Sequence, residues 1–206
     1  MYKVLKDYVK WKYYILNMRT DDQKLENVKL GTLAEQFVVN KINSLNNKNY
    51  SAISIDEALQ YKRFAAVNHK EGDIYINKNG MTFKIDIKSS TKYASPVINI
   101  DAKDKNGKIY LKAEPFLGHI TFDYYIGVGL FNNDPNDLDQ KVHYTLLKTS
   151  EFKALLLDDP THKFGLENYS KGKDINDSDY IFMNKFKECK SYFESDNIED
   201  ILERII

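Results

Sequence analysis

The feature that most constrains this fold is a pair of alternating segments separated by an Asn-Gly dipeptide. Isoleucines alternate with polar residues over 74–77, and apolar residues alternate with polar ones over 82–88. Asn79-Gly80 lies between the two segments. Asn-Gly flanked by alternating apolar residues is the strongest short-range signal for a β-hairpin with a two-residue turn. The sequence therefore predicts an antiparallel hairpin over residues 72–89.

The register of this hairpin brings together three charged residues. If the Asn-Gly dipeptide is the two-residue loop, Asp73 lies directly opposite Asp86. Opposed side chains on one face of an antiparallel pair have Cβ atoms about 4.5–5.5 Å apart. Lys88 is two residues beyond Asp86, so its side chain is expected on the same face of the hairpin.

Two opposed carboxylates repel each other unless a cation relieves the repulsion. Oxygen ligands at this spacing, with nearby waters and backbone carbonyls, suit a hard ion such as Mg²⁺. Such a metal can polarise a phosphoryl oxygen and lower the pKa of a bound water. Lys88 would then stabilise charge on the phosphate or help to deprotonate the water. The alternative is a solvated hairpin face on which Lys88 pairs with Glu71 or another acid.

The pattern of Asp73 followed by Asp86-Ile87-Lys88 resembles the PD-(D/E)xK nuclease superfamily. That family usually adds a glutamate on a helix that precedes the hairpin, and Glu35 is the natural match. The resemblance implies four catalytic residues and a Mg²⁺ site, with Mn²⁺ expected to substitute. The catalytic residues would be Glu35, Asp73, Asp86 and Lys88, and the metal-binding residues Glu35, Asp73, Asp86 and Ile87.

The resemblance also implies a fold and an activity. The fold would be α/β, with a restriction-endonuclease-like core in which helices flank a mixed central β-sheet. The activity would be Mg²⁺-dependent cleavage of double-stranded DNA by a type II restriction endonuclease acting as a homodimer. A Holliday-junction resolvase, a phage recombination nuclease and a non-catalytic module that binds nucleic acid or protein remain alternatives. Two departures stand out, because Gly72 replaces the family's frequent proline and residues 89–120 lack an obvious second core helix.

Glu35 lies in the best predicted helix, which runs from Leu30 to Leu45. Its apolar residues form one stripe at helical period, with Glu35 near the edge of the stripe. A solvated position at the helix edge is the alternative to a catalytic role for this glutamate. The stripe comprises Leu30, Leu33, Ala34, Phe37, Val38, Ile42 and Leu45.

We expect a single domain over 1–206, with the core at about 29–150, an N-terminal helical part at 1–28 and a C-terminal extension at 151–206. Besides the hairpin, buried strands are predicted at 122–131 and 142–147. The remaining predictions are an amphipathic helix at 2–18, a polar connector at 20–27, a strand or short helix at 51–67, an insertion at 91–118, a helix from a Ser150 cap to Leu157, a loop-rich segment at 158–180 and a last helix at 185–205.

Composition limits the class of protein. Formal net charge is +0, so DNA binding would require the basic residues to gather on one face. Lys103, Lys105, Lys108 and Lys112 form either a solvated turn or a DNA-contacting arm. The single cysteine, Cys189, permits no disulfide within the chain. With no expected signal peptide or membrane span, a cytoplasmic protein is predicted.

Overall fold

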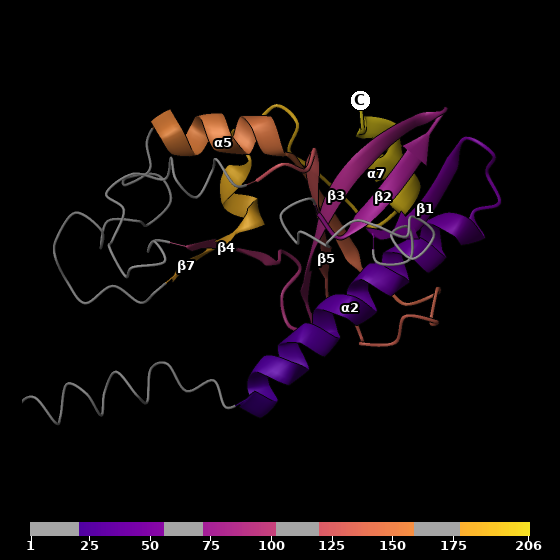
Figure 1. The fold of residues 1–206 in the computed structure, drawn as a ribbon, viewed down its shortest axis with the longest axis horizontal. Coiled ribbons are helices and arrows are strands. Elements are labelled where there is room, and N and C mark those ends of the chain that lie inside the picture. Colours follow the sequence, from indigo (N-terminus) through magenta and orange to yellow (C-terminus); the bar gives the residue numbers. More distant parts are fainter. Residues whose placement is uncertain (1–20, 56–71, 102–119, 159–177) are drawn as a thin grey trace, which may run out of the picture.

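The computed structural model describes residues 21–55, 72–101, 120–158 and 178–206. A six-stranded sheet organises this part of the chain, with strand order β1-β2-β3-β5-β6-β8. Figure 1 shows the sheet with its helices around it. The strands are β1 (Tyr50–Ser54), β2 (Ile74–Lys78), β3 (Met81–Ser90), β5 (Tyr124–Gly129), β6 (His143–Lys148) and β8 (Phe193–Ser195).

The predicted hairpin forms in the predicted register. Strand β2 pairs with β3 from Lys78↔Met81 to Ile74↔Ile85, so the two-residue turn is Asn79-Gly80. Both turn residues have positive φ, 52° and 83°, which is the backbone that a type I′ turn requires. Strand β1 pairs antiparallel with β2 and completes a three-stranded meander.

Strand β5 makes the sheet mixed. It runs parallel to β3, from Ile85↔Tyr124 to Ser90↔Gly129, and antiparallel to β6. All six of its residues are buried, as expected for a central strand covered on both faces. The expectation of an α/β fold with a mixed central sheet flanked by helices is therefore confirmed.

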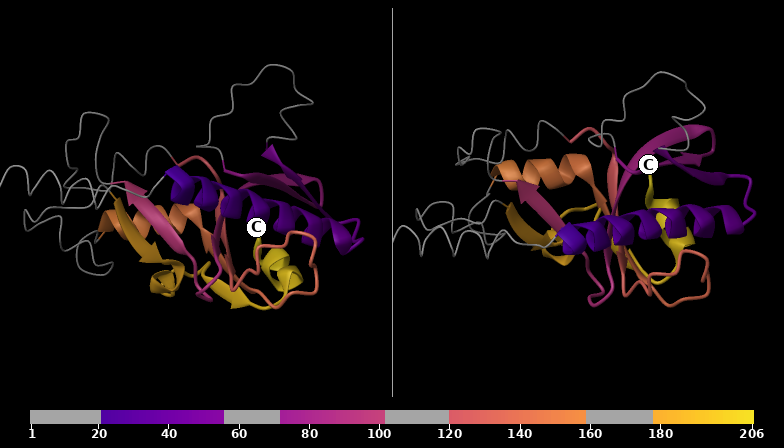
Figure 2. Two further views of the ribbon diagram at one scale, coloured as in Figure 1. Left: turned by 90° about the horizontal axis from the view of Figure 1, so that it is seen from below. Right: turned by 60° about the horizontal axis from the view of Figure 1, so that its bottom comes forward.

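One face of the sheet is covered by helices α2 (Asp21–Ser44) and α7 (Ile198–Arg204). In Figure 2, α2 lies lengthwise along the sheet. The predicted apolar stripe is confirmed: Ala34, Phe37, Val38 and Ile42 are buried, and the three leucines at 30, 33 and 45 pack partly buried against the same cluster. The helix begins at Asp21, however, so the polar connector predicted at 20–27 is wrong.

A second apolar cluster covers the other face. It includes Tyr125 and Leu147 from the sheet, Phe152 from α5 (Thr149–Asp158), and Met183 and Phe186 from the short 3₁₀ helix η2 (Met183–Phe186). A separate two-stranded sheet pairs β4 (Val97–Asp101) with β7 (Ser178–Phe182). Figure 1 places this pair near α5.

The crossing from β3 to β4 approaches β5 closely. A Cβ on Gly129 would lie 1.9 Å from the carbonyl oxygen of Ala94, and the amide of Leu130 donates to the carbonyl of Tyr93 at 3.1 Å. Only a glycine leaves room for this contact. The turn after β3 is thereby held against the end of the parallel strand.

The C-terminal segment differs most from expectation. In place of the single helix predicted over 185–205, the chain forms η2, strand β8 and helix α7. Strand β8 extends the main sheet beside β6, and α7 adds Ile198, Ile201 and Leu202 to the main core. Part of the expected extension thus belongs to the core.

Smaller corrections concern the ends of elements. Helix α5 begins at Thr149, so Ser150 lies within the first turn and does not cap it. Strand β1 occupies the start of the segment predicted as strand or short helix at 51–67. Strand β4 lies within the insertion predicted at 91–118. The helix predicted at 2–18 lies outside the described residues.

Candidate active site

Asp73 lies where strand β2 begins, but it is not in register with Asp86 as predicted. The regular ladder ends at Ile74↔Ile85, and the Asp73 amide donates to the carbonyl of Ile85 at 2.7 Å. One carboxylate oxygen of Asp73 accepts a hydrogen bond from the Ile87 amide at 2.7 Å. The carboxylate of Asp73 therefore binds the edge of β3 at Ile87, the residue that follows Asp86.

Gly72 precedes Asp73 at the entry to the hairpin. Its φ of +99° lies in the region that favours glycine, and an added Cβ would stand 2.7 Å from the Ile85 carbonyl oxygen. Proline, which fixes φ near −65°, cannot adopt this backbone. The glycine at position 72 is therefore required both by its backbone conformation and by its close approach to Ile85.

Asp86 and Lys88 form an ion pair on β3 in which the aspartate is buried and the lysine is partly exposed. Asp86 is 8% exposed, and its Oδ2 pairs with the Lys88 ammonium. Burial raises the pKa of Asp86, although the neighbouring ammonium of Lys88 opposes that shift. The main cause of the raised pKa of Asp86 is thus burial and not a facing carboxylate.

Lys88 is the point at which the four predicted residues meet. Burial disfavours its charged form, yet the pKa of Lys88 is raised because Asp86, Asp73 and Glu35 all stabilise the ammonium, Asp86 most strongly. Glu35 comes from α2, and the other three come from the β2–β3 hairpin. The helix and the hairpin therefore converge on one charged cluster, here called the Lys88 cluster and consisting of Glu35, Asp73, Asp86 and Lys88.

Tyr125 borders this cluster, although no sequence pattern singles it out. It is the partner of Asp86 across the parallel β3–β5 pair, and its ring centroid lies 5.9 Å from the Lys88 ammonium. Burial, followed by the charge of Asp86, raises the pKa of Tyr125 well above its ordinary value. Local sequence does not distinguish it from the neighbouring buried tyrosine, because only the parallel register assigns it to this face.

The chemistry of these side chains can be set against what a magnesium ion requires. Asp73 and Asp86 offer hard carboxylate oxygens, and the Oδ2 atom of Asp86 already carries a cationic partner, the Lys88 ammonium. Within the described residues, no group of three or more His, Cys, Asp or Glu side chains is arranged to hold a metal ion. Mg²⁺ commonly takes one or two carboxylates and keeps several waters, so a pair of aspartates fits its chemistry.

Other residues considered from sequence lie elsewhere. His143 Nδ1 contacts Asp196 at 2.7 Å, on the far side of β6 from the hairpin. Cys189 is buried in the second apolar cluster, and burial raises the pKa of its thiol to about 11, which disfavours the nucleophilic thiolate form. The other histidines (His69, His119 and His162) and the lysines of the possible DNA-contacting arm lie outside the described residues.

Comparisons of the chain with protein-family models, with curated proteins and with solved structures found no match. Among the described residues, none of the helices combines the length and apolar character needed to cross a membrane.

Proposed function

We propose that this protein hydrolyses phosphodiester bonds in double-stranded DNA with the help of Mg²⁺. The observation that carries the proposal is the Lys88 cluster, in which Asp86 pairs with Lys88 and two further acids, Asp73 and Glu35, lie within electrostatic range of the same ammonium. The order of elements supports it as well. Helix α2 with Glu35 precedes the β2–β3 hairpin, and β3 is followed in the sheet by the parallel strand β5.

The residues divide into metal-binding and charge-stabilising roles. Asp73 and Asp86 would hold the metal, and Glu35 would orient its water shell or join a second metal site. A bound Mg²⁺ would polarise the phosphate and make a bound water more acidic. Ile87 contributes through its amide, which holds the Asp73 carboxylate in place.

Lys88 is assigned as a cation and not as the base. Its pKa is raised and its three acidic neighbours favour the ammonium, so it remains protonated at neutral pH. A protonated lysine can neutralise charge that develops on the phosphate, but it cannot accept a proton from water. Of the two roles considered for Lys88, its acidic surroundings favour stabilisation of the transition state.

Incubation of the protein with plasmid DNA and Mg²⁺ tests the proposal. We expect cleavage that falls on the order of a hundredfold or more in Asp73→Ala and in Asp86→Ala. Asp139→Ala is the matched control, because Asp139 is an exposed aspartate in the turn between β5 and β6. Undiminished cutting by either site variant, purified away from contaminating nuclease, would exclude the assignment.

The pattern of products separates the candidate functions. Discrete fragments from linear DNA are expected of a restriction endonuclease, whereas selective cleavage of four-way junctions indicates a resolvase. Binding without cleavage in Mg²⁺ or Mn²⁺ would indicate a non-catalytic module.

Metal binding has a readout that is independent of cleavage. Mg²⁺ at about 100 times its Kd should stabilise the wild type by about 2.7 kcal/mol through mass action. Asp86→Asn should gain little, because it lacks one of the two charged ligands. Thermal melts in chelator and in excess Mg²⁺ or Ca²⁺ measure the difference.

A further inference from the structure

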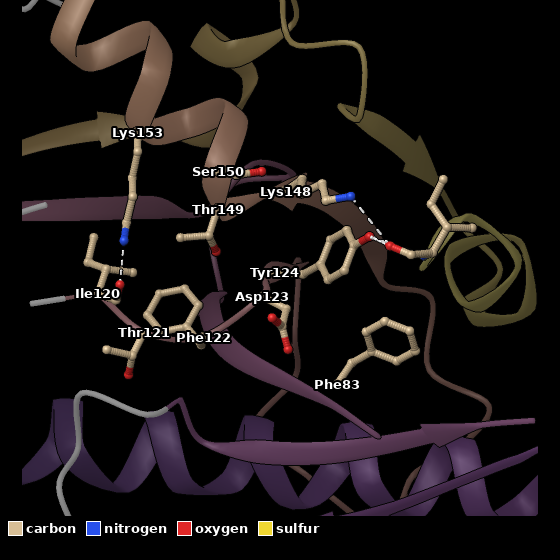
Figure 3. A pocket seen from close by; sticks show the side chains of 11 residues that line it. Phe83, Ile120, Thr121, Phe122, Asp123, Tyr124, Lys148, Thr149, Ser150 and Lys153 are labelled. Atoms are coloured by element: carbon tan, nitrogen blue, oxygen red, sulfur yellow. Dashed lines mark hydrogen bonds between the residues drawn. The ribbon is translucent and has the colours of Figure 1, made fainter. Parts of the chain in front are cut away.

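A pocket of about 400 Å³ lies beside the start of helix α5. Figure 3 shows Lys148 and Lys153 on either side of Thr149, above Phe122 and Asp123. The volume falls within the range of about 300–1,000 Å³ typical of ligand sites. The further lining residues are Phe83, Ile120, Thr121, Tyr124, Ser150 and Ile206.

The charges around the pocket favour an anion. The Lys153 ammonium donates to the Ile120 carbonyl, and the Lys148 ammonium donates to the Ile206 carbonyl at 3.4 Å. Neither lysine pairs with an Asp or Glu side chain among the described residues, and both donate instead to main-chain oxygens. The start of α5 adds the partial positive charge of a helix N-terminus.

Two acids nearby are already engaged. The Asp123 carboxylate lines the pocket, but its Oδ2 accepts from the Lys84 amide at 2.8 Å. Glu151, in the first turn of α5, accepts from the amide and hydroxyl of Ser191 at 2.9 and 3.0 Å. The side chains that line the pocket therefore include two ammonium groups and one carboxylate.

Thr149 gives a second, independent indication of a ligand. The residue is 3% exposed, and its hydroxyl has no hydrogen-bond partner among the described residues. Its amide is already bound to the Asp123 carbonyl at 2.9 Å. Figure 3 shows the hydroxyl pointing into the pocket between the two lysines. A buried hydroxyl without a partner costs free energy, which a ligand with acceptor oxygens would recover.

We propose that this pocket binds a phosphate group, and that the phosphate belongs to a DNA strand bound at the Lys88 cluster. The assignment of this phosphate to DNA rests on the proposed function. Position supports it, because the ring of Phe122 contacts that of Tyr125 at a centroid distance of 4.7 Å. Tyr125 in turn borders Lys88, so the pocket flanks the candidate active site.

The main test is DNA binding by a double variant that keeps side-chain length but removes charge. Lys148→Gln/Lys153→Gln should bind a labelled duplex in Ca²⁺ about tenfold more weakly than the wild type. The slope of log Kd against log salt should fall by about 2, which corresponds to two lost phosphate contacts. Lys48→Gln/Lys141→Gln, at two exposed lysines on other turns, is the matched control and should change neither value.

Thr149→Val provides a second variant that preserves shape. It should weaken duplex binding roughly threefold without altering the salt slope. Because the hydroxyl has no partner in the free protein, the variant should melt no lower than the wild type. A melt of each variant checks that the fold is intact.

The outcomes separate this inference from the proposed function. If the wild type binds the duplex and the Lys148/Lys153 variant keeps the wild-type salt slope, the phosphate site is overturned. If the wild type does not bind the duplex, the proposed function fails and calorimetric titration with inorganic phosphate decides the site. Heat of binding that is present in the wild type and lost in the variant would support a site for a free phosphate. Equal titrations would overturn it.

Discussion

The carboxylate of Asp86 is almost out of contact with water. The Lys88 ammonium does not fully offset the free-energy cost of burying its negative charge. The raised pKa records that balance, since the neutral form of Asp86 is relatively more favourable in the folded chain than in the unfolded one. Metal binding and proton binding would therefore compete for the same oxygen atoms.

The first residue-scale prediction concerns the stability of the metal-free protein. A raised folded pKa contributes stability that is present below the unfolded pKa, near 3.8, and is lost as pH rises through the folded pKa. At neutral pH the wild type carries the full cost, whereas Asp86→Asn mimics the neutral acid. We expect Asp86→Asn to be more stable at pH 7 by on the order of 1 kcal/mol.

Melts of both proteins in chelator from pH 4 to pH 8 measure this effect. The advantage of Asp86→Asn should shrink toward the acid end, where Asp86 takes up its proton. A variant that melts below the wild type at pH 7 would show that the ion pair with Lys88 outweighs burial.

The second prediction at this scale concerns Lys88. Lys88→Met keeps much of the stem but removes the positive charge, so turnover should fall on the order of a hundredfold. Kd for DNA in Ca²⁺ should change by less than about threefold, because one charge among many contacts is lost. Single-turnover cleavage and fluorescence anisotropy measure the two quantities, with Lys141→Met as control. Normal turnover with weakened binding would make Lys88 a DNA-contacting residue only.

At the scale of elements, the β2–β3 hairpin has two glycines with positive φ, and they differ in what surrounds them. Gly80 has φ +83°, and a Cβ added there would meet open space, whereas Gly72 has φ +99° and the Ile85 carbonyl in the way. Gly80 allows the turn, and Gly72 sets how Asp73 enters the site. Substitutions at the two positions therefore distinguish the cost of a positive φ, which both glycines share, from the cost of steric crowding, which arises at Gly72.

We predict that Gly72→Ala destabilises the protein by about 1–3 kcal/mol and that Gly80→Ala costs about 1 kcal/mol or less. Gly72→Ala should also weaken cleavage, because the Asp73 carboxylate loses its position at the Ile87 amide. Chemical denaturation and a cleavage assay below the unfolding transition test both effects. Equal losses of stability in the two variants would argue against the close contact at Gly72.

At the scale of the whole molecule, one Lys88 cluster per chain would cut one strand at a time. A double-strand break then requires a second copy, and two-fold symmetry supplies it. We predict that the species that makes concerted double-strand breaks is a dimer on DNA. Sedimentation of the complex in Ca²⁺, compared with the order of nicked and linear products in Mg²⁺, tests this. A monomer that still makes concerted breaks would refute it.

The sequence alone determined features that depend on neighbours along the chain. The Asn-Gly turn dictates the pairing of β2 with β3, and helical periodicity identifies the buried face of α2, because turn chemistry and side-chain spacing act locally. The hairpin pattern selected Asp73, Asp86 and Lys88, and the resemblance to the PD-(D/E)xK nucleases added Glu35. The alternation of the hairpin also placed Asp86 and Lys88 on one face.

Only the tertiary structure decided how those residues meet their surroundings. Three features arise where segments distant in sequence pack together. They are the close approach of Gly72 to Ile85, the position of Tyr125 beside Lys88, and the pocket at α5. The same holds for β8 and α7, whose residues read as one helix in isolation. Strand β8 forms because the edge of β6 offers backbone hydrogen bonds, and such pairing across distant segments overrides local helical preference.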